Sequence, residues 1–586
     1  MTRILGDADA FVADALRGFA RAHADEVSLV DGGVVRVNPL EPGKVAVLIG
    51  GGSGHYPAFA GYVGTGLAAG AVCGNVFTSP STAQALRVAH AADAGGGILF
   101  TYGRYAGDVI HFGEAERRLR DEGIDARTVL ITDDVASAPP EAADERRGIA
   151  GIVCVFHIAG AAAERGDTID EVERLAAHAN SRTRSHGVAF AGCTLPGADH
   201  ALFEVPAGQM SIGLGIHGEP GVRDVPLQSA SELAVTLAAP LLEERPHDGR
   251  RAAVIVNGLG SVKYEELFVL FGCVVEHLEA QGVEIVEPLC GEFVTSLDMA
   301  GVSLTLLWLD DELEELWRAP ASSPALRKGG WSADTPSVRA TAAGRPAEVE
   351  SGPGVGQAPA PATSAPATPA AQRAAVLARR MLISAREAIA AEADRLGELD
   401  AIAGDGDHGI GMTRGLTAAV EAAESADESI GVEELLERAG DAWSETAGGT
   451  SGALWGAALA EVGRSLGSPE AFTAADVAAA VASAHARVAA LGGAAPGDKT
   501  MLDAMAPFDQ TLTERVQAGT GLAATLAAAA AAARSGADAT SAMTPRRGRA
   551  RPLAERSIGH PDPGAVSFSI IAADLAGWVA DFNGSE

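Results

Sequence analysis

The chain has 586 residues, of which 47% are hydrophobic and 5% aromatic, and a formal net charge of −33 at pH 7. This length exceeds what one hydrophobic core supports and predicts several domain-sized units. The acidic charge argues against nucleic acid or an anionic membrane surface as a partner. The N-terminal sequence MTRILGDADAFV lacks the basic-then-apolar pattern of a signal peptide, and we expect no apolar run of about 18 residues that could span a membrane.

The cysteines indicate the cellular compartment. There are five, an odd number, and they are widely scattered (Cys73, Cys154, Cys193, Cys273, Cys290). Such spacing suits neither a disulfide framework nor a zinc site. We therefore expect a cytoplasmic protein.

Residues 1–331 are predicted to form an α/β domain with two α/β subdomains. Short β-rich runs alternate there with helical patterns, which is typical of α/β layers. The runs are VAVLIG, GILFTY, TVLIT, IVCVF, AAVIVNGLG and VEIVEPL.

A second, helical domain is predicted after a linker. Residues 332–371 are rich in Ala, Pro, Thr and Gly with almost no large apolar residue, so they cannot bury a core and read as a flexible linker. Residues 372–586 contain long Ala-rich segments with helical apolar spacing, which predict an all-α bundle or barrel.

Three aspartates, Asp400, Asp405 and Asp407, lie close together in the glycine-flanked stretch LDAIAGDGDHG. Carboxylates this close repel one another, and oxygen ligands select a hard cation such as Mg²⁺. A calcium-binding EF-hand does not fit, because Ile410 and Leu416 occupy the positions that require glycine and glutamate. A solvated acidic turn is the structural alternative. We predict a Mg²⁺–nucleotide centre at one end of the helical domain.

Three polar residues in the first domain follow predicted strands. His55 ends the glycine-rich GGGSGHYP after strand Val45–Ile49, Asp108 follows a strand and a turn, and a predicted strand Ser211–Ile216 leads to His217. A phosphate loop is disfavoured because the Lys-Ser/Thr pair is missing. Each histidine alone is more often a structural residue. Three such junctions together predict a ligand pocket at the carboxyl edge of a sheet.

The motifs resemble those of the dihydroxyacetone (glycerone) kinases, in their single-chain, ATP-dependent form. GGGSGHYPAFAGYVGTGLAAGAVCGNVFTSPS, YAGDVIHFG and IGLGIHGEPG resemble the substrate-binding half of that family. LDAIAGDGDHG, GGTSGALWG, GDKTMLDAMAP and GRARPLAERSIGHPDPGAVS resemble its nucleotide-binding half, in the same order. The resemblance covers nearly the whole chain outside the linker. It implies phosphorylation of a short-chain ketose with ATP and Mg²⁺.

The resemblance implies roles for the first-domain residues. His217 corresponds to the histidine that holds the ketone carbonyl as a covalent hemiaminal. His55 and Asp108 bind substrate hydroxyls and assist proton transfer, and which of the two is the main base stays open. Substrate contacts are implied for Gly52, Ser53, Gly54, His55 and Asp108.

The resemblance also implies a nucleotide site in the second domain. Asp400, Asp405 and Asp407 would hold Mg²⁺ between the ATP phosphates. By position alone, Met501 would be a core residue and Arg549 a solvated one. The implied nucleotide contacts are His408, Gly409, Ile410, Gly411, Thr450, Ser451, Gly492, Met501, Arg549, Asp562, Pro563 and Gly564.

Three departures from the family pattern fall near the ketose motifs. Tyr56 replaces a usual Glu, Gly103-Arg104 replaces Lys-Asn, and His111 replaces Asn. Loss of a lysine opens volume, and Tyr56 is expected to add an aromatic wall. We therefore expect a ketose longer than dihydroxyacetone, with erythrulose the first candidate.

Two other functions and one assembly question stay open. A phosphoenolpyruvate-linked phosphotransferase would need a carrier protein, and a ketose-sensing regulatory protein would not need the three-aspartate loop. An FMN-cyclase activity cannot be judged from these residues. The resemblance implies a homodimer, and the linker is long enough for transfer within or between subunits.

Overall fold

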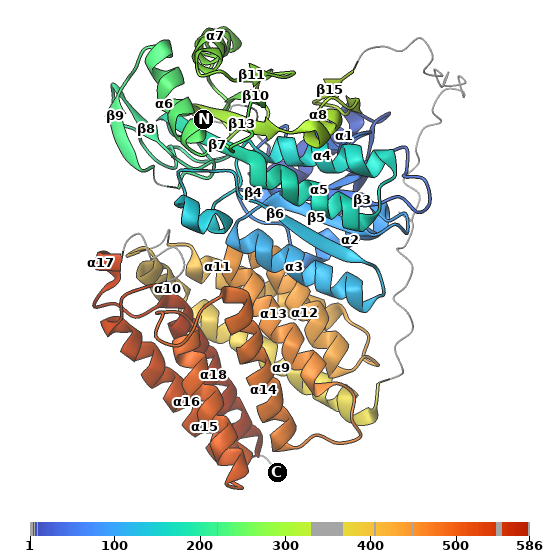
Figure 1. The fold of residues 1–586 in the computed structure, drawn as a ribbon. Helices are drawn as coiled ribbons and strands as arrows, with labels where there is room; N and C mark the ends of the chain where they lie inside the picture. The colour runs from blue at the N-terminus through green and yellow to red at the C-terminus, as the bar shows by residue number, and fades with distance from the viewer. Residues whose placement is uncertain are drawn as a thin grey trace.

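The computed structural model describes residues 4, 6–8, 10–219, 221–329, 367–403, 406–447, 449–546 and 554–583. Figure 1 shows two parts, an α/β part from the N-terminal half of the chain above a helical part from the C-terminal half. An α/β N-terminal region followed by an all-helical region is what the sequence predicted, and the prediction is confirmed.

The first sheet has the strand order β1-β2-β4-β3-β5-β6. Strands β3 to β6 pair in parallel, and the β1–β2 hairpin joins β4 antiparallel. The elements of this region are α1 (Phe11–Ala22), β1 (Val27–Val30), β2 (Gly33–Arg36), β3 (Ala46–Ser53), η1 (Ala60–Tyr62), β4 (Gly70–Val76), α2 (Thr82–Ala92), β5 (Ile98–Gly103), α3 (Ala106–Asp121), β6 (Ala126–Ile131) and η2 (Pro140–Glu145).

The second sheet has the order β11-β10-β13-β7-β8-β9, with β12 also paired to β10. A short hairpin, β14–β15, closes this part of the chain. The elements are α4 (Ile152–Arg165), α5 (Ile169–Arg182), β7 (Thr183–Ala191), β8 (Gln209–Ile212), β9 (Arg223–Pro226), α6 (Ala230–Glu243), β10 (Arg251–Gly258), α7 (Tyr264–Ala280), β11 (Glu284–Ile285), β12 (Leu289–Gly291), β13 (Ala300–Leu309), α8 (Asp311–Trp317), β14 (Ala321–Ser322) and β15 (Arg327–Lys328).

Helices and sheets alternate in layers, with α4 and α5 between the two sheets (Figure 1). Successive side chains of a strand point to opposite faces of its sheet, so each sheet contributes side chains to a hydrophobic core on either face. On β3, Val47 and Ile49 pack in the cluster that contains α4, whereas Leu48 packs in the cluster that contains α2 and α3. Val254 of β10 likewise faces α6 and α7.

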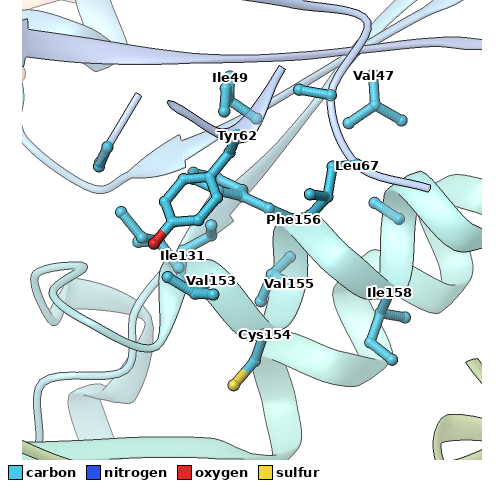
Figure 2. Close-up of a cluster of buried hydrophobic side chains, with 14 of the residues drawn as sticks. Val47, Ile49, Tyr62, Leu67, Ile131, Val153, Cys154, Val155, Phe156 and Ile158 are labelled. Atoms are coloured by element: carbon cyan, nitrogen blue, oxygen red, sulfur yellow. The ribbon is translucent and has the colours of Figure 1, made fainter. Parts of the chain in front are cut away.

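The run IVCVF at 152–156 is helical, and its prediction as a strand was wrong. It begins α4, whose residues from Ile152 to Ala163 are all buried. Figure 2 shows Val153, Cys154, Val155 and Phe156 of this helix in the central core with Tyr62. A helix buried on all sides is apolar all round, so a short apolar run does not distinguish it from a buried strand.

The helical part is a closed ring of antiparallel helices. Successive helices α11 to α16 pack against one another, and α18 and α9 complete the ring between α16 and α11. Trp443 and Trp455 stack inside it with ring centroids 5.3 Å apart. The helices are α9 (Pro369–Ala391), α10 (Ala393–Asp400), α11 (His408–Ser425), α12 (Val432–Ala447), α13 (Gly449–Leu466), α14 (Ala474–Gly492), α15 (Leu502–Gln517), α16 (Leu522–Ala539), η3 (Thr540–Ala542), α17 (Ala554–Ser557) and α18 (Pro563–Asn583).

Two differences from the sequence analysis concern the helical part. Helix α9 begins at Pro369, inside the segment 332–371 expected to be linker, and Thr368 caps it by accepting the Ala371 amide. Two helices, α14 and α18, have the length and hydropathy of a membrane span, although no such run was expected. Both pack in the ring, α14 against α13 and α15, and α18 against α16 and α9.

Candidate active site

A small cavity lies at the carboxyl ends of β3 and β5. Strand β4 lies on one side of β3 and strand β5 lies on the other side, so the strand order reverses at β3. Ligands bind at such a switch point of a parallel sheet. The cavity has about 320 Å³ of empty space. Its lining residues are Gly50, Gly51, Gly52, His55, Phe59, Gly103, Tyr105, Asp108, Gly148, Ile152, Ile216, His217 and Val294.

His55 and His217 meet in this cavity. His55 follows β3 of the first sheet, and His217 follows β8 of the second sheet. Strand β8 ends at Ile212 and not at Ile216 as predicted, because Gly213 turns the chain with a left-handed φ of 74°. The two Nε2 atoms are 3.0 Å apart.

The hydrogen bonds of His55 determine its tautomer. Its Nδ1 atom lies 2.8 Å from the Thr295 carbonyl oxygen, which can only accept, so Nδ1 carries the proton. Burial first, and then the charge of His217, lower the pKa of His55 to about 3. His55 is therefore neutral near pH 7, and its unprotonated Nε2 can accept a hydrogen bond from Nε2 of His217.

Glu219 orients His217, and the sequence analysis did not single it out. The Glu219 carboxylate lies 3.2 Å from Nδ1 of His217 and accepts the His217 backbone N–H at 3.0 Å. Burial raises the pKa of Glu219, but the charge and hydrogen bond of His217 outweigh it and the net pKa is lowered. A carboxylate at Nδ1 keeps a proton on that nitrogen, so Nε2 is the ring atom that can give up its proton and become available for chemistry.

Asp108 lies in the first turn of α3 and lines the same cavity. Its Oδ1 atom accepts a hydrogen bond from the Ser79 hydroxyl at 2.8 Å. Burial raises its pKa to about 6, although the Ser79 hydrogen bond and the His217 charge oppose the rise. A carboxylate with a pKa this close to neutral is suited to accepting a proton from a hydroxyl group.

Three of the five implied substrate contacts line the cavity, and two do not. Gly52 lines the cavity, as do His55 and Asp108. Ser53 and Gly54 do not line it, and the Ser53 hydroxyl donates to the Gly74 carbonyl at 2.7 Å.

Of the three departures from the family pattern, only Gly103 lines the cavity. Tyr56 is 53% exposed and lies against Phe19, so the expectation that it forms an aromatic wall was wrong. His111 is buried near Thr82, outside the lining. Tyr105 forms an aromatic wall instead. Its ring stands perpendicular to His217 at 4.5 Å, and its hydroxyl donates to the Gly148 carbonyl at 2.9 Å.

A second, larger cavity lies at one end of the helical ring, with about 980 Å³ of empty space open to solvent. Because alternate helices run in opposite directions, α11, α13, α15 and α18 all begin at this end. Helix N-termini carry unpaired N–H groups and a partial positive charge, and they bind phosphates. The lining residues are Leu399, Asp400, Ile402, Ala403, His408, Ser451, Leu454, Trp455, Lys499, Thr500, Met501, Ser557, His560, Pro561, Asp562, Pro563 and Gly564.

Half of the implied nucleotide contacts, and one implied metal ligand, line this cavity. Seven predicted site residues line it: Asp400, His408, Ser451, Met501, Asp562, Pro563 and Gly564. Five do not line it: Gly409 and Thr450 are chain neighbours of the lining residues His408 and Ser451, Ile410 and Gly411 follow near the start of α11, and Gly492 lies at the end of α14. Asp405 and Arg549 lie outside the described residues.

Two of the three predicted metal-binding aspartates are described. Asp400 lines the cavity and accepts the Gly406 N–H at 2.9 Å, and Asp407 precedes α11. Partial burial and then the negative charge of Asp400 raise the pKa of Asp407. A bound cation would relieve the repulsion between these two carboxylates. Among the described residues, no group of three His, Cys, Asp or Glu side chains lies close enough to hold a metal ion. Asp400 at the cavity and the neighbouring Asp407 fit Mg²⁺ that keeps water and phosphate ligands.

Lys499 is a cavity residue that the sequence analysis missed, although it lies in a quoted motif. Its ammonium donates to the Ser557 carbonyl at 2.7 Å and to the Met543 carbonyl at 3.2 Å. Asp503 fixes the same turn by accepting the Thr500 N–H at 2.8 Å. Nearby, burial raises the pKa of Asp562 to about 7, while its hydrogen bond from the Ala565 N–H opposes the rise.

Comparisons with known proteins follow the same division of the chain. A family model described as Dak1 domain matches residues 17–325, and one described as DAK2 domain matches residues 402–577. The chain is 50% identical to an L-erythrulose kinase of Pectobacterium atrosepticum, covering 97% of this chain and 95% of that protein. It is also 50% identical to a D-erythrulose kinase of Mycolicibacterium smegmatis, covering 98% of both.

A solved structure resembles the whole chain. It is that of the dihydroxyacetone kinase from C. freundii in complex with AMP-PNP and Mg²⁺. It is 27% identical, covers 98% of this chain and 99% of that one, and superposes with a TM-score of 0.52.

Proposed function

Because the chain belongs to the dihydroxyacetone kinase family, in its single-chain form, we propose that it is an ATP-dependent kinase of a short-chain ketose. One observation carries this proposal. The same chain holds a small His–His–Asp cavity at a sheet edge and a larger cavity at which four helices begin. The smaller cavity suits a small polyhydroxyl ketone, and the larger cavity suits a nucleoside triphosphate.

The proposal includes covalent capture of the ketone by His217. Nε2 of His217 first releases its proton to solvent, and its lone pair then adds to the carbonyl carbon. The electrons of the C=O π bond move to oxygen, and the oxygen takes one proton from solvent. The positive charge that develops on the ring faces the Glu219 carboxylate at Nδ1. Glycerol has no carbonyl, so it cannot be held in this way.

Asp108 is proposed as the base for the attacking hydroxyl. Its carboxylate removes the hydroxyl proton as the oxygen attacks the γ-phosphorus of ATP and the bond to the β-phosphate oxygen breaks, releasing ADP. His55 stays neutral and hydrogen-bonds the substrate through Nε2. Such general base catalysis contributes about 10²–10⁴-fold to the rate.

ATP and Mg²⁺ are proposed to bind at the cavity of the helical ring. Asp400 and Asp407, with Asp405 between them in the chain, would hold Mg²⁺, which neutralises phosphate charge when bound. The N–H groups at the starts of α11, α13 and α18 would hold the phosphates. The C. freundii relative, whose structure contains AMP-PNP and Mg²⁺, supports this assignment.

Erythrulose is the proposed ketose. Gly103 leaves the cavity wall without a side chain, and a Cβ atom there would meet the Gly148 carbonyl and the Tyr105 ring at 3.1 Å. The two 50% identical relatives are named for L- and D-erythrulose. The turnover of D-erythrulose compared with that of L-erythrulose decides which enantiomer is the substrate.

We propose that residues 1–331 form one domain and that the second domain begins with α9 at Pro369 and not at 372 as predicted, so that the linker between them ends at 368. We also propose that the protein is a cytoplasmic homodimer. Light scattering of the purified protein tests the dimer, because a mass near 59.3 kDa, that of one chain, would contradict it. Limited proteolysis tests the boundaries, and cleavage is expected within 332–368.

The experiment for the proposed function measures ADP release with Mg²⁺–ATP and dihydroxyacetone, D-erythrulose, L-erythrulose, glyceraldehyde or glycerol. We expect turnover with ketoses, fastest with an erythrulose, and none with glycerol. Carbon-13 NMR of a carbonyl-labelled ketose should show the hemiaminal carbon, and His217→Ala should abolish that resonance. No turnover with any ketose would contradict the kinase and favour a carrier-dependent or sensing role.

A further inference from the structure

A charged contact between the two parts of the chain is not used by either site. It joins α2 and α3 of the α/β part to α12, α13 and α14 of the helical ring, which lie side by side (Figure 1). We call this contact the interdomain joint. Its residues are Ser81, Arg87, Glu114, Arg117, Arg118, Glu437, Asp441, Glu445, Arg464 and Arg487.

Glu114 of α3 is the centre of the joint. Its side chain is only 8% exposed and contacts arginines of both parts of the chain. Arg117 and Arg118 approach from α3 at 2.7 and 3.0 Å, Arg464 from α13 at 3.8 Å, and Arg487 of α14 donates to Oε2. Burial opposes the charged form of Glu114, but its hydrogen bond from Arg117 and the other arginine charges lower its pKa to about 2.

Arg118 and Asp441 form the most regular pair across the joint. Arg118 donates from Nη1 to Oδ2 at 3.1 Å and from Nη2 to Oδ1 at 3.0 Å, a two-pronged geometry that fixes both distance and orientation. Arg118 is 14% exposed, so this pair differs from solvent-exposed ion pairs, which contribute little.

The third contact lies next to both candidate sites. Glu445, near the end of α12, accepts from Arg87 at 2.6 Å and from the Ser81 hydroxyl at 3.2 Å. Two residues before Ser81, the hydroxyl of Ser79 donates to Asp108. On the other side, α12 ends at Ala447 and α13 begins at Gly449, close to Ser451 of the larger cavity.

We infer that the interdomain joint positions the nucleotide domain against the ketose domain for phosphoryl transfer, with Glu114, Arg118, Asp441 and Glu445 as positioning residues. The inference rests on the proposed function. Transfer needs the attacking hydroxyl and the γ-phosphate in line and close together, and a displacement of about 1 Å can cost 10²-fold in rate. In a chain with a net charge of −33, paired charges at the joint also overcome repulsion between its two acidic parts.

Charge reversal in the full-length protein tests the joint. The variants are Arg118→Asp, Asp441→Arg and the double variant that exchanges the two charges. We expect each single variant to lower kcat about 10²-fold. Both KM values should stay within about twofold, because neither residue lines a cavity. The double variant should raise kcat above both single variants but not to the wild-type value. The pair with position 441 is restored in reverse, while the new carboxylate at position 118 still faces Glu114, which Arg118 contacts at 3.0 Å.

Arg438→Glu is the matched control, because Arg438 is an exposed residue of α12 that pairs with Glu434 of the same helix. It should leave kcat unchanged. Single variants with wild-type kcat, or a double variant no better than the singles, would overturn the inference. Glu445→Gln removes one charge without reversal and provides the test if Asp441→Arg does not fold.

Small-angle X-ray scattering separates failure of the joint from failure of the proposed function. The single reversals should increase the radius of gyration, and the double variant should bring it back toward the wild-type value, whether or not any ketose is turned over. If wild-type protein phosphorylates no ketose, the proposed function is contradicted, and the scattering still decides the joint. An unchanged radius of gyration in both single variants would overturn it.

Discussion

The Nε2 atoms of His55 and His217 lie 3.0 Å apart, although the residues are 162 positions apart in the chain and follow strands of different sheets. The contact requires the two sheets to be held at a constant separation. The buried helix α4, packed between them, provides that separation. The site therefore depends on the central core shown in Figure 2 as well as on its own residues.

Glu219→Ala should lower kcat/KM for ketoses about 10²-fold, because Nδ1 of His217 loses the carboxylate that fixes its tautomer. Glu219→Gln keeps an acceptor without the charge and should be intermediate. Steady-state kinetics with the preferred ketose measures both. Binding of Mg²⁺–ATP should not change, and Glu204→Ala, at an exposed position of the preceding loop, is the control. Wild-type kinetics in Glu219→Ala would contradict the orienting role.

The pH dependence of kcat/KM should follow the protonation state of the Asp108 carboxyl group. Its pKa is raised to about 6, so the carboxyl group is protonated below that pH and cannot accept a proton. Activity should therefore rise with pH through about 6 and then level off. Asp108→Asn should abolish this step and lower kcat by about 10²–10⁴-fold.

Ser79→Ala tests the assignment of the acidic limb of the pH profile to Asp108. The Ser79 hydroxyl stabilises the Asp108 carboxylate, so its removal should raise the pKa of Asp108 further. The acidic limb of the pH profile should move to higher pH while the activity at alkaline pH is retained. A shift to lower pH would contradict the assignment of that limb to Asp108.

Gly103→Ala should reduce preference for the four-carbon ketose. A Cβ atom at Gly103 would meet the Gly148 carbonyl and the Tyr105 ring at 3.1 Å and narrow the cavity. The ratio of kcat/KM for erythrulose to that for dihydroxyacetone should fall about tenfold, the usual size of a one-carbon discrimination. Gly113→Ala is the control, because Gly113 lies on the helix α3 that follows β5 and a Cβ atom there would have open space. An unchanged ratio would show that Gly103 does not determine chain length.

The sequence predicted which motifs carry the site but not how each side chain points. His55, Asp108 and His217 were found because each stands at a strand-to-loop junction of a long motif. Tyr56 was misplaced because neighbouring residues of a chain point in different directions, and only the tertiary fold shows that Tyr105 faces His217.

The same limitation applies to Glu219 and Lys499. Both lie in motifs that were quoted, but their roles come from contacts with His217 and with the Ser557 carbonyl, and no spacing rule predicts those contacts. The segment at 152–156 was misassigned because burial on both sides removes the periodicity that separates helix from strand.

Asp400→Asn should weaken Mg²⁺-dependent nucleotide binding without changing ketose binding. Asp400 lines the larger cavity, and its charge is one of two described carboxylates available to the cation. Isothermal titration with AMP-PNP in Mg²⁺ should show a Kd about 10-fold or more higher than wild type, and EDTA should abolish tight binding in the wild-type protein. The ketose-induced carbon-13 resonance should persist in both cases, because His217 lies in the other domain. Asp394→Asn, near the start of the same helix α10 and outside the cavity, is the matched control. Nucleotide binding that is equally tight in Asp400→Asn and in EDTA would contradict a metal-dependent site at this end of the ring.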